Sequence, residues 1–309
     1  MKQIILFVLT FLVSTSIQSQ SEIDAQKNLN IDSLITHLDI DTSGWHNIQA
    51  EINAVPPMDT VTLDQSLDIA KDTAYASKLL NESIGLMNMH NYDLAYLKAD
   101  SARQIYILRI GYECKEVAHC LNQFGRTNYL ENDFSNSIKF YKKALAIMLK
   151  KYTVANSYAG NLCYNIGLSY FQLEQYDSTI LYNRNALFIK TIKPDNDFSA
   201  VIASYFEIGK SYMNIGNLNS AIEYLQKSLQ YQLIQDPHDS LKFVEIFLYI
   251  AHVHYFKGEF NKAEKYILKS LEINHKANGN QLNSALLYTF LGGIYEEYGN
   301  YNKSIELHL

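Results

Sequence analysis

Apolar residues along most of this chain recur three and four positions apart, as in Ile222, Leu225 and Leu229. An α-helix turns once every 3.6 residues, so this spacing places the apolar side chains on one face of a helix. Proline, which ends helices, occurs only 4 times in 309 residues. The pattern therefore predicts an all-α protein in which each helix buries one apolar stripe.

A repeat runs through these helical stretches. Three of them carry a glycine followed three residues later by tyrosine, as in Gly167 and Tyr170. Small residues occupy the equivalent position at intervals of 42, 42, 42, 42 and 41 residues: Ser83, Gly125, Gly167, Gly209, Ala251 and Gly292. A second small position lies twelve residues further on: Ala95, Ser137, Thr179, Ala221, Ala263 and Ser304. A third follows seven residues later: Ala102, Ala144, Ala186, Ser228 and Ser270.

Between the first and second small positions lies an aromatic residue or leucine, at Tyr92, Phe134, Tyr176, Leu218, Phe260 and Tyr301. Turn-forming residues precede it in most copies, as in Gly216-Asn217 and Gly299-Asn300. Each copy therefore predicts two helices joined by a turn. Two helices approach closely where side chains are small, so small residues of the first should face small residues of the second. One pair cannot bury its own stripe, and successive pairs should stack.

This arrangement resembles the tetratricopeptide repeat, which keeps small residues at its eighth, twentieth and twenty-seventh positions and an aromatic at its eleventh. The usual unit has about 34 residues, and the longer unit here is similar to those of kinesin light chains and of bacterial signalling and CHAT-domain proteins. The resemblance implies a right-handed α-solenoid of about six units over residues 76–309, the last one truncated. Leu86, Asn128 and His254 depart from the family's tyrosine. The extra residues should lengthen the second helix and its exit loop, where Asp197 or Ser199 is expected to cap the next helix.

The two ends differ from the repeat. Lys2 followed by the apolar run from Ile4 to Val13 predicts a signal peptide over residues 1–19, with a buried N-terminal helix as the alternative. No other segment is apolar enough to cross a membrane. Residues 20–75 are expected to form an N-terminal cap or a partly ordered linker. The second helix of the last unit starts near Asn302 and stops at Leu309, which predicts that the chain continues in a longer parent protein.

Charge and motifs point away from catalysis. The net charge is −6 and no basic run occurs, which disfavours nucleic acid as a partner. No nucleophile, phosphate-loop or zinc-protease motif occurs, so no enzymatic activity, cofactor or metal is expected. Cys114, Cys120 and Cys163 are expected to be small buried side chains. A metal set of Cys114, His119 and Cys120 is disfavoured because these residues lie on different helix faces. His252 and His254 are expected to be structural, with one facing the groove and one the core.

The resemblance implies that partner peptides lie along the surface made by the first helices. Projecting that surface gives an aromatic groove with two cations: Asn122, Arg126, Tyr129, Tyr164, Phe171, Phe206, Lys210, Met213, His252, Tyr255 and Phe256. The alternative is that packing within the chain fills this groove. Family members that clamp a partner's C-terminal carboxylate use Lys, Arg and Asn there. Asn165 fits that pattern, but Ala203 and Glu207 do not.

These observations predict a scaffold that binds a protein or peptide on its concave surface. The alternative is a sensory or regulatory arm of a larger signalling or CHAT-protease-like protein. The signal-like start predicts export, either to the periplasm or out of the cell. The partner's identity and the oligomeric state stay open.

Overall fold

The computed structural model describes residues 69–152, 157–192, 198–235, 240–276 and 281–308, and these form helices without any strand. The helices are α4 (Ile69–Asn88), α5 (Tyr92–Arg109), α6 (Lys115–Leu130), α7 (Phe134–Tyr152), α8 (Ser157–Gln172), α9 (Tyr176–Ile192), α10 (Ser199–Ile215), α11 (Leu218–Gln235), α12 (Ser240–Phe256), α13 (Phe260–Lys276), α14 (Gln281–Glu297) and α15 (Tyr301–His308). The expected all-α repeat architecture is confirmed.

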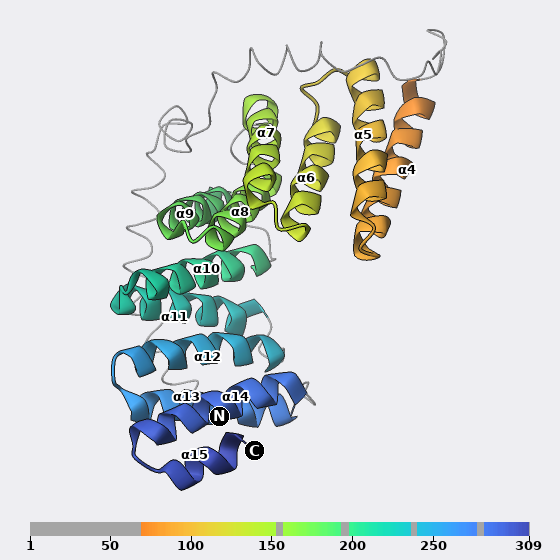
Figure 1. Ribbon diagram of the computed structural model, residues 1–309. Helices are drawn as coiled ribbons and strands as arrows, with labels where there is room; N and C mark the ends of the chain where they lie inside the picture. Colours follow the sequence, from red (N-terminus) through yellow and green to blue (C-terminus); the bar gives the residue numbers. More distant parts are fainter. Residues whose placement is uncertain (1–68, 153–156, 193–197, 236–239, 277–280, 309) are drawn as a thin grey trace. The chain divides into compact units, whose positions relative to one another are not determined.

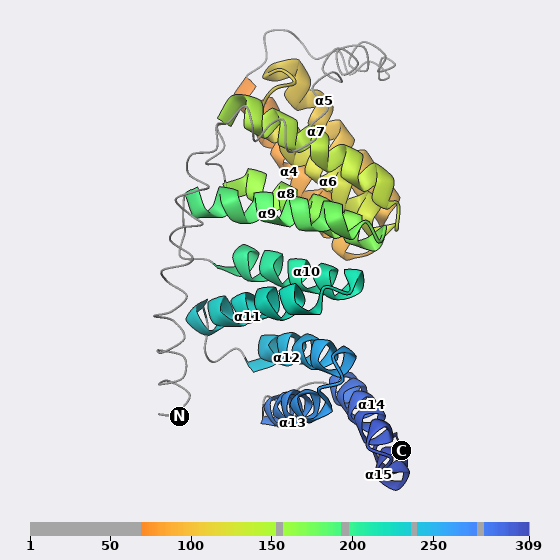
Figure 2. The same ribbon diagram turned by 90° about the vertical axis from the view of Figure 1, so that its left-hand side faces the viewer.

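The chain forms two compact units. The first contains the described residues within the ranges 1–162 and 188–193, and the second contains those within the ranges 163–187 and 194–309. In the first unit α4 pairs with α5 and α6 with α7, and α5 packs on α6 (Figure 1). In the second unit α10 pairs with α11, α12 with α13, and α14 with α15, and these pairs stack on one another (Figure 2). Within each unit, paired helices therefore pack in chain order, as the repeat predicts.

The small repeat positions are buried in every copy that the structure describes. The hydroxyl of Ser83 donates a hydrogen bond to the carbonyl oxygen of Ala95 at 2.7 Å, which joins the first and second small positions. In another copy the direction is reversed: the hydroxyl of Thr179, at the second small position, donates to the carbonyl oxygen of Gly167, at the first, at 3.2 Å. The expected close approach of paired helices at these positions is confirmed.

Each helical glycine of the first small position faces a large side chain sixteen residues further on. A β-carbon added at Gly125 would lie 2.5 Å from two ring atoms of Tyr141, and one at Gly209 would lie 2.7 Å from Cγ of Leu225. Asn183 takes the same place opposite Gly167. The glycine is therefore required by its large neighbour on the second helix, as well as by the small residues.

The turn between the two helices of each repeat has a residue with left-handed backbone conformation at the same repeat position: His90, Asn132, Glu174, Gly216, Gly258 and Gly299. This conformation ends the first helix, and the N–H of Asn217 then donates to the carbonyl oxygen of Tyr212 at 2.9 Å. The next residue begins the second helix: Oδ1 of Asn217 accepts a hydrogen bond from the N–H of Ser220 at 3.2 Å. The Gly-Asn pairs of the sequence are thus a C-terminal stop and an N-terminal cap.

One expectation about the start of a helix is wrong, and others concern residues that the structure does not describe. Ser199 is the first residue of α10, and Phe198 takes the N-cap position without a side-chain hydrogen bond, so the prediction that Ser199 caps this helix is wrong. The alternative cap, Asp197, lies outside the described residues, as do the predicted signal peptide and residues 20–68. Described helix α4 begins at Ile69, ahead of the expected start of the repeats at residue 76.

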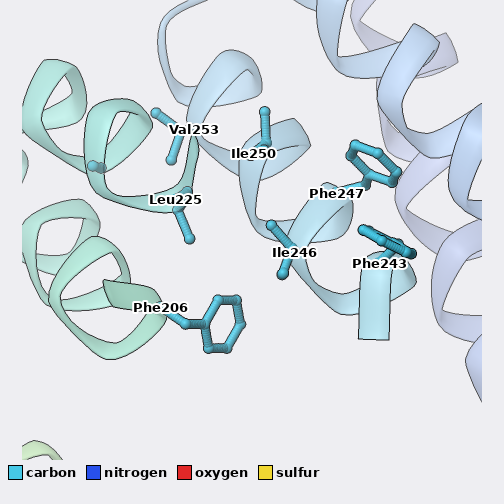
Figure 3. Close-up of a cluster of buried hydrophobic side chains, with 8 residues drawn as sticks. Phe206, Leu225, Phe243, Ile246, Phe247, Ile250 and Val253 are labelled. Atoms are coloured by element: carbon cyan, nitrogen blue, oxygen red, sulfur yellow. The ribbon is translucent and has the colours of Figure 1, made fainter. Parts of the chain in front are cut away.

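The core of the second unit is continuous across helix pairs. Figure 3 shows Phe206 and Leu225, from α10 and α11, on the side of α12 that carries Ile246 and Ile250. Leu225 and Ile250 have no exposed surface. Burial of a leucine or isoleucine side chain contributes about 1.5–3 kcal/mol. Stacking of one helix pair on the next is therefore driven by these apolar stripes.

Candidate functional site

The residues predicted to line the groove all lie on first helices of the repeats. Asn122, Arg126 and Tyr129 belong to α6 in the first unit. The others belong to the second unit: Tyr164 and Phe171 on α8, Phe206, Lys210 and Met213 on α10, and His252, Tyr255 and Phe256 on α12. The structure gives these two sets different surroundings.

In the second unit Lys210 lies among aromatic rings of its own chain. Its Nζ is 4.5 Å from the ring centre of Phe171, 5.3 Å from that of Phe206 and 5.5 Å from that of Tyr249. These are cation–π distances. Phe206 is only 8% exposed and belongs to the buried cluster, against which Met213 also packs. This part of the predicted groove is occupied by packing within the chain.

An ion pair holds Lys210 in place. Its Nζ lies 3.0 Å from Oε1 of Glu207, and both side chains are largely buried. Burial raises the pKa of Glu207. Burial acts to lower the pKa of Lys210, but the carboxylate of Glu207 and other nearby groups outweigh it and the pKa is raised. Lys210 therefore stays a cation that is committed to its internal partners.

On α12 the predicted residues contact the next helix pair. His252 lies against Phe290 with ring centres 4.3 Å apart, and burial lowers its pKa. The hydroxyl of Tyr255 donates to Oε1 of Glu297 at 2.8 Å. Phe256 is 62% exposed. His254 is buried and its Nδ1 lies 2.7 Å from Glu259, so of the two histidines it is the one in the core.

The first unit contains a cavity of about 690 Å³. It is bordered by α4, by α6 and by Tyr158 at the start of α8, together with Tyr106 and Ile110. Its size lies within the range typical of sites for small ligands or peptide side chains. Two of the predicted groove residues, Asn122 and Arg126, line it. The predicted surface is therefore hollowed at α4 and α6.

A polar row on α6 lines this cavity: Glu116, His119, Gln123 and Arg126. Their spacing of three, four and three residues places them on one helix face. Arg126 Nη1 donates to Oε1 of Gln123 at 3.1 Å, which fixes both side chains. Gln123 is 3% exposed, and its Nε2 has no hydrogen-bond partner among the described residues. A buried amide donor without an acceptor costs free energy, and this one lies at a cavity wall.

The ring centres of His119 and Tyr158 lie 4.5 Å apart. Desolvation lowers the pKa of His119, so it is neutral near pH 7. The formally charged residues that line the cavity are Glu116 and Arg126.

Sequence reasoning found Arg126 and Asn122 but missed Glu116, His119 and Gln123. The signal for these residues is a set of polar side chains at spacings of three and four on one helix face. Glu116 lies before the positions from which the family resemblance defines a groove.

Other candidate chemistry is not supported in the described parts of the chain. No group of three or more His, Cys, Asp or Glu residues there could hold a metal ion. The three cysteines are free and buried, as expected. None of the helices in those parts is both long enough and apolar enough to span a bilayer.

Comparisons with known proteins agree with the repeat. The family model of the tetratricopeptide repeat matches residues 202–233 and 244–276. These two ranges start at the first positions of the fourth and fifth repeats. The curated proteins contain no match.

Solved structures share the fold. A kinesin light chain with nearly identical repeats from Podosopora anserina is 12% identical with a TM-score of 0.58, covering 67% of this chain and 97% of that one. A STAND signal-transduction ATPase with a tetratricopeptide sensor, from Pyrococcus horikoshii, is 17% identical with a TM-score of 0.64, covering 79% and 37%. A Rap protein complexed with competence and sporulation factor is 15% identical with a TM-score of 0.52, covering 76% and 74%.

Proposed function

Because this chain is a tetratricopeptide-repeat protein, we propose that it is a non-catalytic scaffold that binds a partner protein or peptide on the face of its first helices. The observation that carries this proposal is the cavity between α4 and α6, whose wall holds an amide donor of Gln123 that has no partner among the residues that the structure describes. The corresponding face around Lys210 is filled by its own side chains. We therefore assign the binding site to the first unit.

The likeness to other proteins supports this proposal without identifying the partner. The Rap protein with a similar fold is complexed with competence and sporulation factor. The repeats of the STAND ATPase are described as a sensor. Both are consistent with repeats that hold another molecule.

The test fills the cavity without disturbing the core. Ser77 is exposed and lines the cavity, whereas its neighbour Lys78 is exposed but does not. A photo-cross-linking residue at Asn81, which also lines the cavity, would first identify the partner by mass spectrometry. Binding of that partner to the full chain would then be measured for Ser77→Trp and for the control Lys78→Trp.

The proposal expects Ser77→Trp to weaken binding at least about tenfold, which is roughly 1.4 kcal/mol, while Lys78→Trp binds as the unchanged chain does. Circular dichroism would verify that both variants keep their helices. If the two variants bind the partner with equal affinity, the cavity is not part of the binding site and the proposal is wrong.

Export is a separate part of the proposal and rests on Lys2 and the apolar run after it. Expression of the full reading frame, followed by mass measurement of the mature protein, would test it. A mature protein that keeps residues 1–19 would contradict export by this route.

A further inference from the structure

The polar row on α6 has opposite charges at its two ends. Glu116 lies at the start of the row and Arg126 at its end, with His119 and Gln123 between them. Ten residues of helix separate the two charges, which corresponds to about 15 Å at 1.5 Å per residue. The cavity therefore presents a negative end and a positive end to whatever occupies it.

The facing wall carries no charge. The positions 42 residues earlier, on α4, are Ala74, Ser77, Asn81 and Ile84, and all four line the same cavity. Leu80 adds a further apolar side chain to this wall. An occupant thus meets charged groups on α6 and mostly small or apolar groups on α4.

Neither end of the row is neutralised strongly by the described residues. Arg126 makes no ion pair there, and its hydrogen bond goes to the neutral amide of Gln123. Glu116 has a loose contact with Lys115, 3.9 Å between Oε1 and Nζ. At the positive end, the amide donor of Gln123 also finds no acceptor in the described part of the chain. The positive end therefore suits a carboxylate, and the negative end suits an ammonium or guanidinium group.

The separation sets the length of the occupant. An extended chain advances about 3.3 Å per residue and its side chains alternate, so residues i and i+4 lie on one side, about 13 Å apart. The long side chains of Lys or Arg and of Asp or Glu cover the remaining distance. Residues i+1 and i+3 then point to the opposite wall, where Leu80 and Ile84 lie.

Building on the proposed scaffold function, we propose that this cavity binds an extended partner segment of about five residues, with a basic side chain at one end, an acidic one at the other, and apolar residues between them. The basic end lies at Glu116 and the acidic end at Arg126.

The test uses synthetic peptides and the full chain. Two blocked dipolar peptides, Lys-Leu-Ser-Leu-Asp and Asp-Leu-Ser-Leu-Lys, cover both chain directions. The controls carry lysine at both ends or aspartate at both ends. Calorimetric titration at low salt should show that one dipolar peptide binds at least about tenfold tighter than both controls, because each charge-assisted contact favours its own end.

A charge swap makes the test specific. In the double variant Glu116→Arg/Arg126→Glu the preference between the two dipolar peptides should reverse, whereas a role in folding alone predicts no reversal. The single variants Glu116→Gln and Arg126→Gln should each erase the advantage over one like-charged control. These neutral variants keep the test usable if the double swap fails to fold.

Other outcomes overturn the inference. Equal binding of the doubly acidic peptide would indicate a simple carboxylate site. Tightest binding by a peptide of residues 25–34, which contains Lys27 and Asp32, would assign the cavity to the chain's own segment. Binding by none of the peptides, while Ser77→Trp still weakens the captured partner, would refute the dipolar ligand and leave the scaffold function intact.

Discussion

Gly125 tests the physical basis of the repeat most directly. It lies in the middle of α6, where alanine favours the helix over glycine by about 1 kcal/mol. A β-carbon at Gly125, however, would lie 2.5 Å from Cδ1 and Cε1 of Tyr141 and 2.9 Å from Cζ. Tyr141 is 3% exposed, so its rigid ring has little room to move. Gly125→Ala should therefore be destabilising despite the gain in helix propensity.

The magnitude follows from these two opposing effects. Overpacking a well-packed core costs about 1–3 kcal/mol, and contact with three atoms of one ring belongs at the upper end. Subtracting the helix gain leaves a net loss of about 1–2 kcal/mol. Gly85, in the last turn of α4 in the same unit, has nothing within 4 Å of the added β-carbon. Gly85→Ala should therefore raise stability by about 0.5–1 kcal/mol.

The assay is urea unfolding followed by circular dichroism, with hydrogen exchange on α6 and α7 to locate the effect. Repeat proteins do not always unfold in one step, so the local exchange of α6 and α7 gives the decisive free energy. The reasoning is refuted if Gly125→Ala is as stable as Gly85→Ala. In that case close packing against Tyr141 would not explain why the eighth repeat position is glycine at residue 125.

Three further predictions follow from single contacts. Glu174→Gly should stabilise the chain by about 0.5–1 kcal/mol in urea unfolding, because Glu174 has a φ of 57°, whereas Gly216→Ala, at φ 87°, should destabilise it. Lys210→Met should cost about 3 kcal/mol at pH 7, since it leaves Glu207 buried without its cation. Burial already raises the pKa of Glu207 in the folded state. The loss of stability in Lys210→Met should therefore shrink as the pH falls and Glu207 takes up a proton. A loss of stability that is independent of pH would contradict this explanation. Burial raises the pKa of Cys163 to about 12, so iodoacetamide at pH 8 should label it only after unfolding, as mass spectrometry would show.

The fold was predictable because its determinants are local and repeated. Small residues at fixed intervals imply close helix pairs, and Gly216-Asn217 and Gly299-Asn300 imply the turns between them. Three turns were less visible, since His90, Asn132 and Glu174 take the left-handed conformation without being glycine. Their place in the repeat, and not their residue type, identifies them.

The site was less predictable because exposure of a first-helix residue depends on its neighbours in other units. Phe206 looks like a groove residue in sequence, yet Tyr249 of α12 lies against its ring with the ring centres 5.0 Å apart. Gln123 looks ordinary in sequence, yet it is buried beside a cavity with an amide donor that no described residue pairs. Which large side chain fills which gap is a property of three-dimensional packing that spacing alone does not contain.

Two cations show how small sequence differences open or close such a face. Arg126 and Lys210 occupy the same repeat position, 84 residues apart, and each contacts the residue three positions before it. For Lys210 that residue is Glu207, so its charge is satisfied within the chain and Phe171 and Tyr249 enclose it. For Arg126 it is Gln123, a neutral amide that orients the guanidinium but leaves its charge unbalanced. Since an unbalanced cation at a cavity wall attracts an anion from outside, the glutamine at this repeat position is one of the differences that, under the proposed function, leave Arg126 available to an anionic group of the partner.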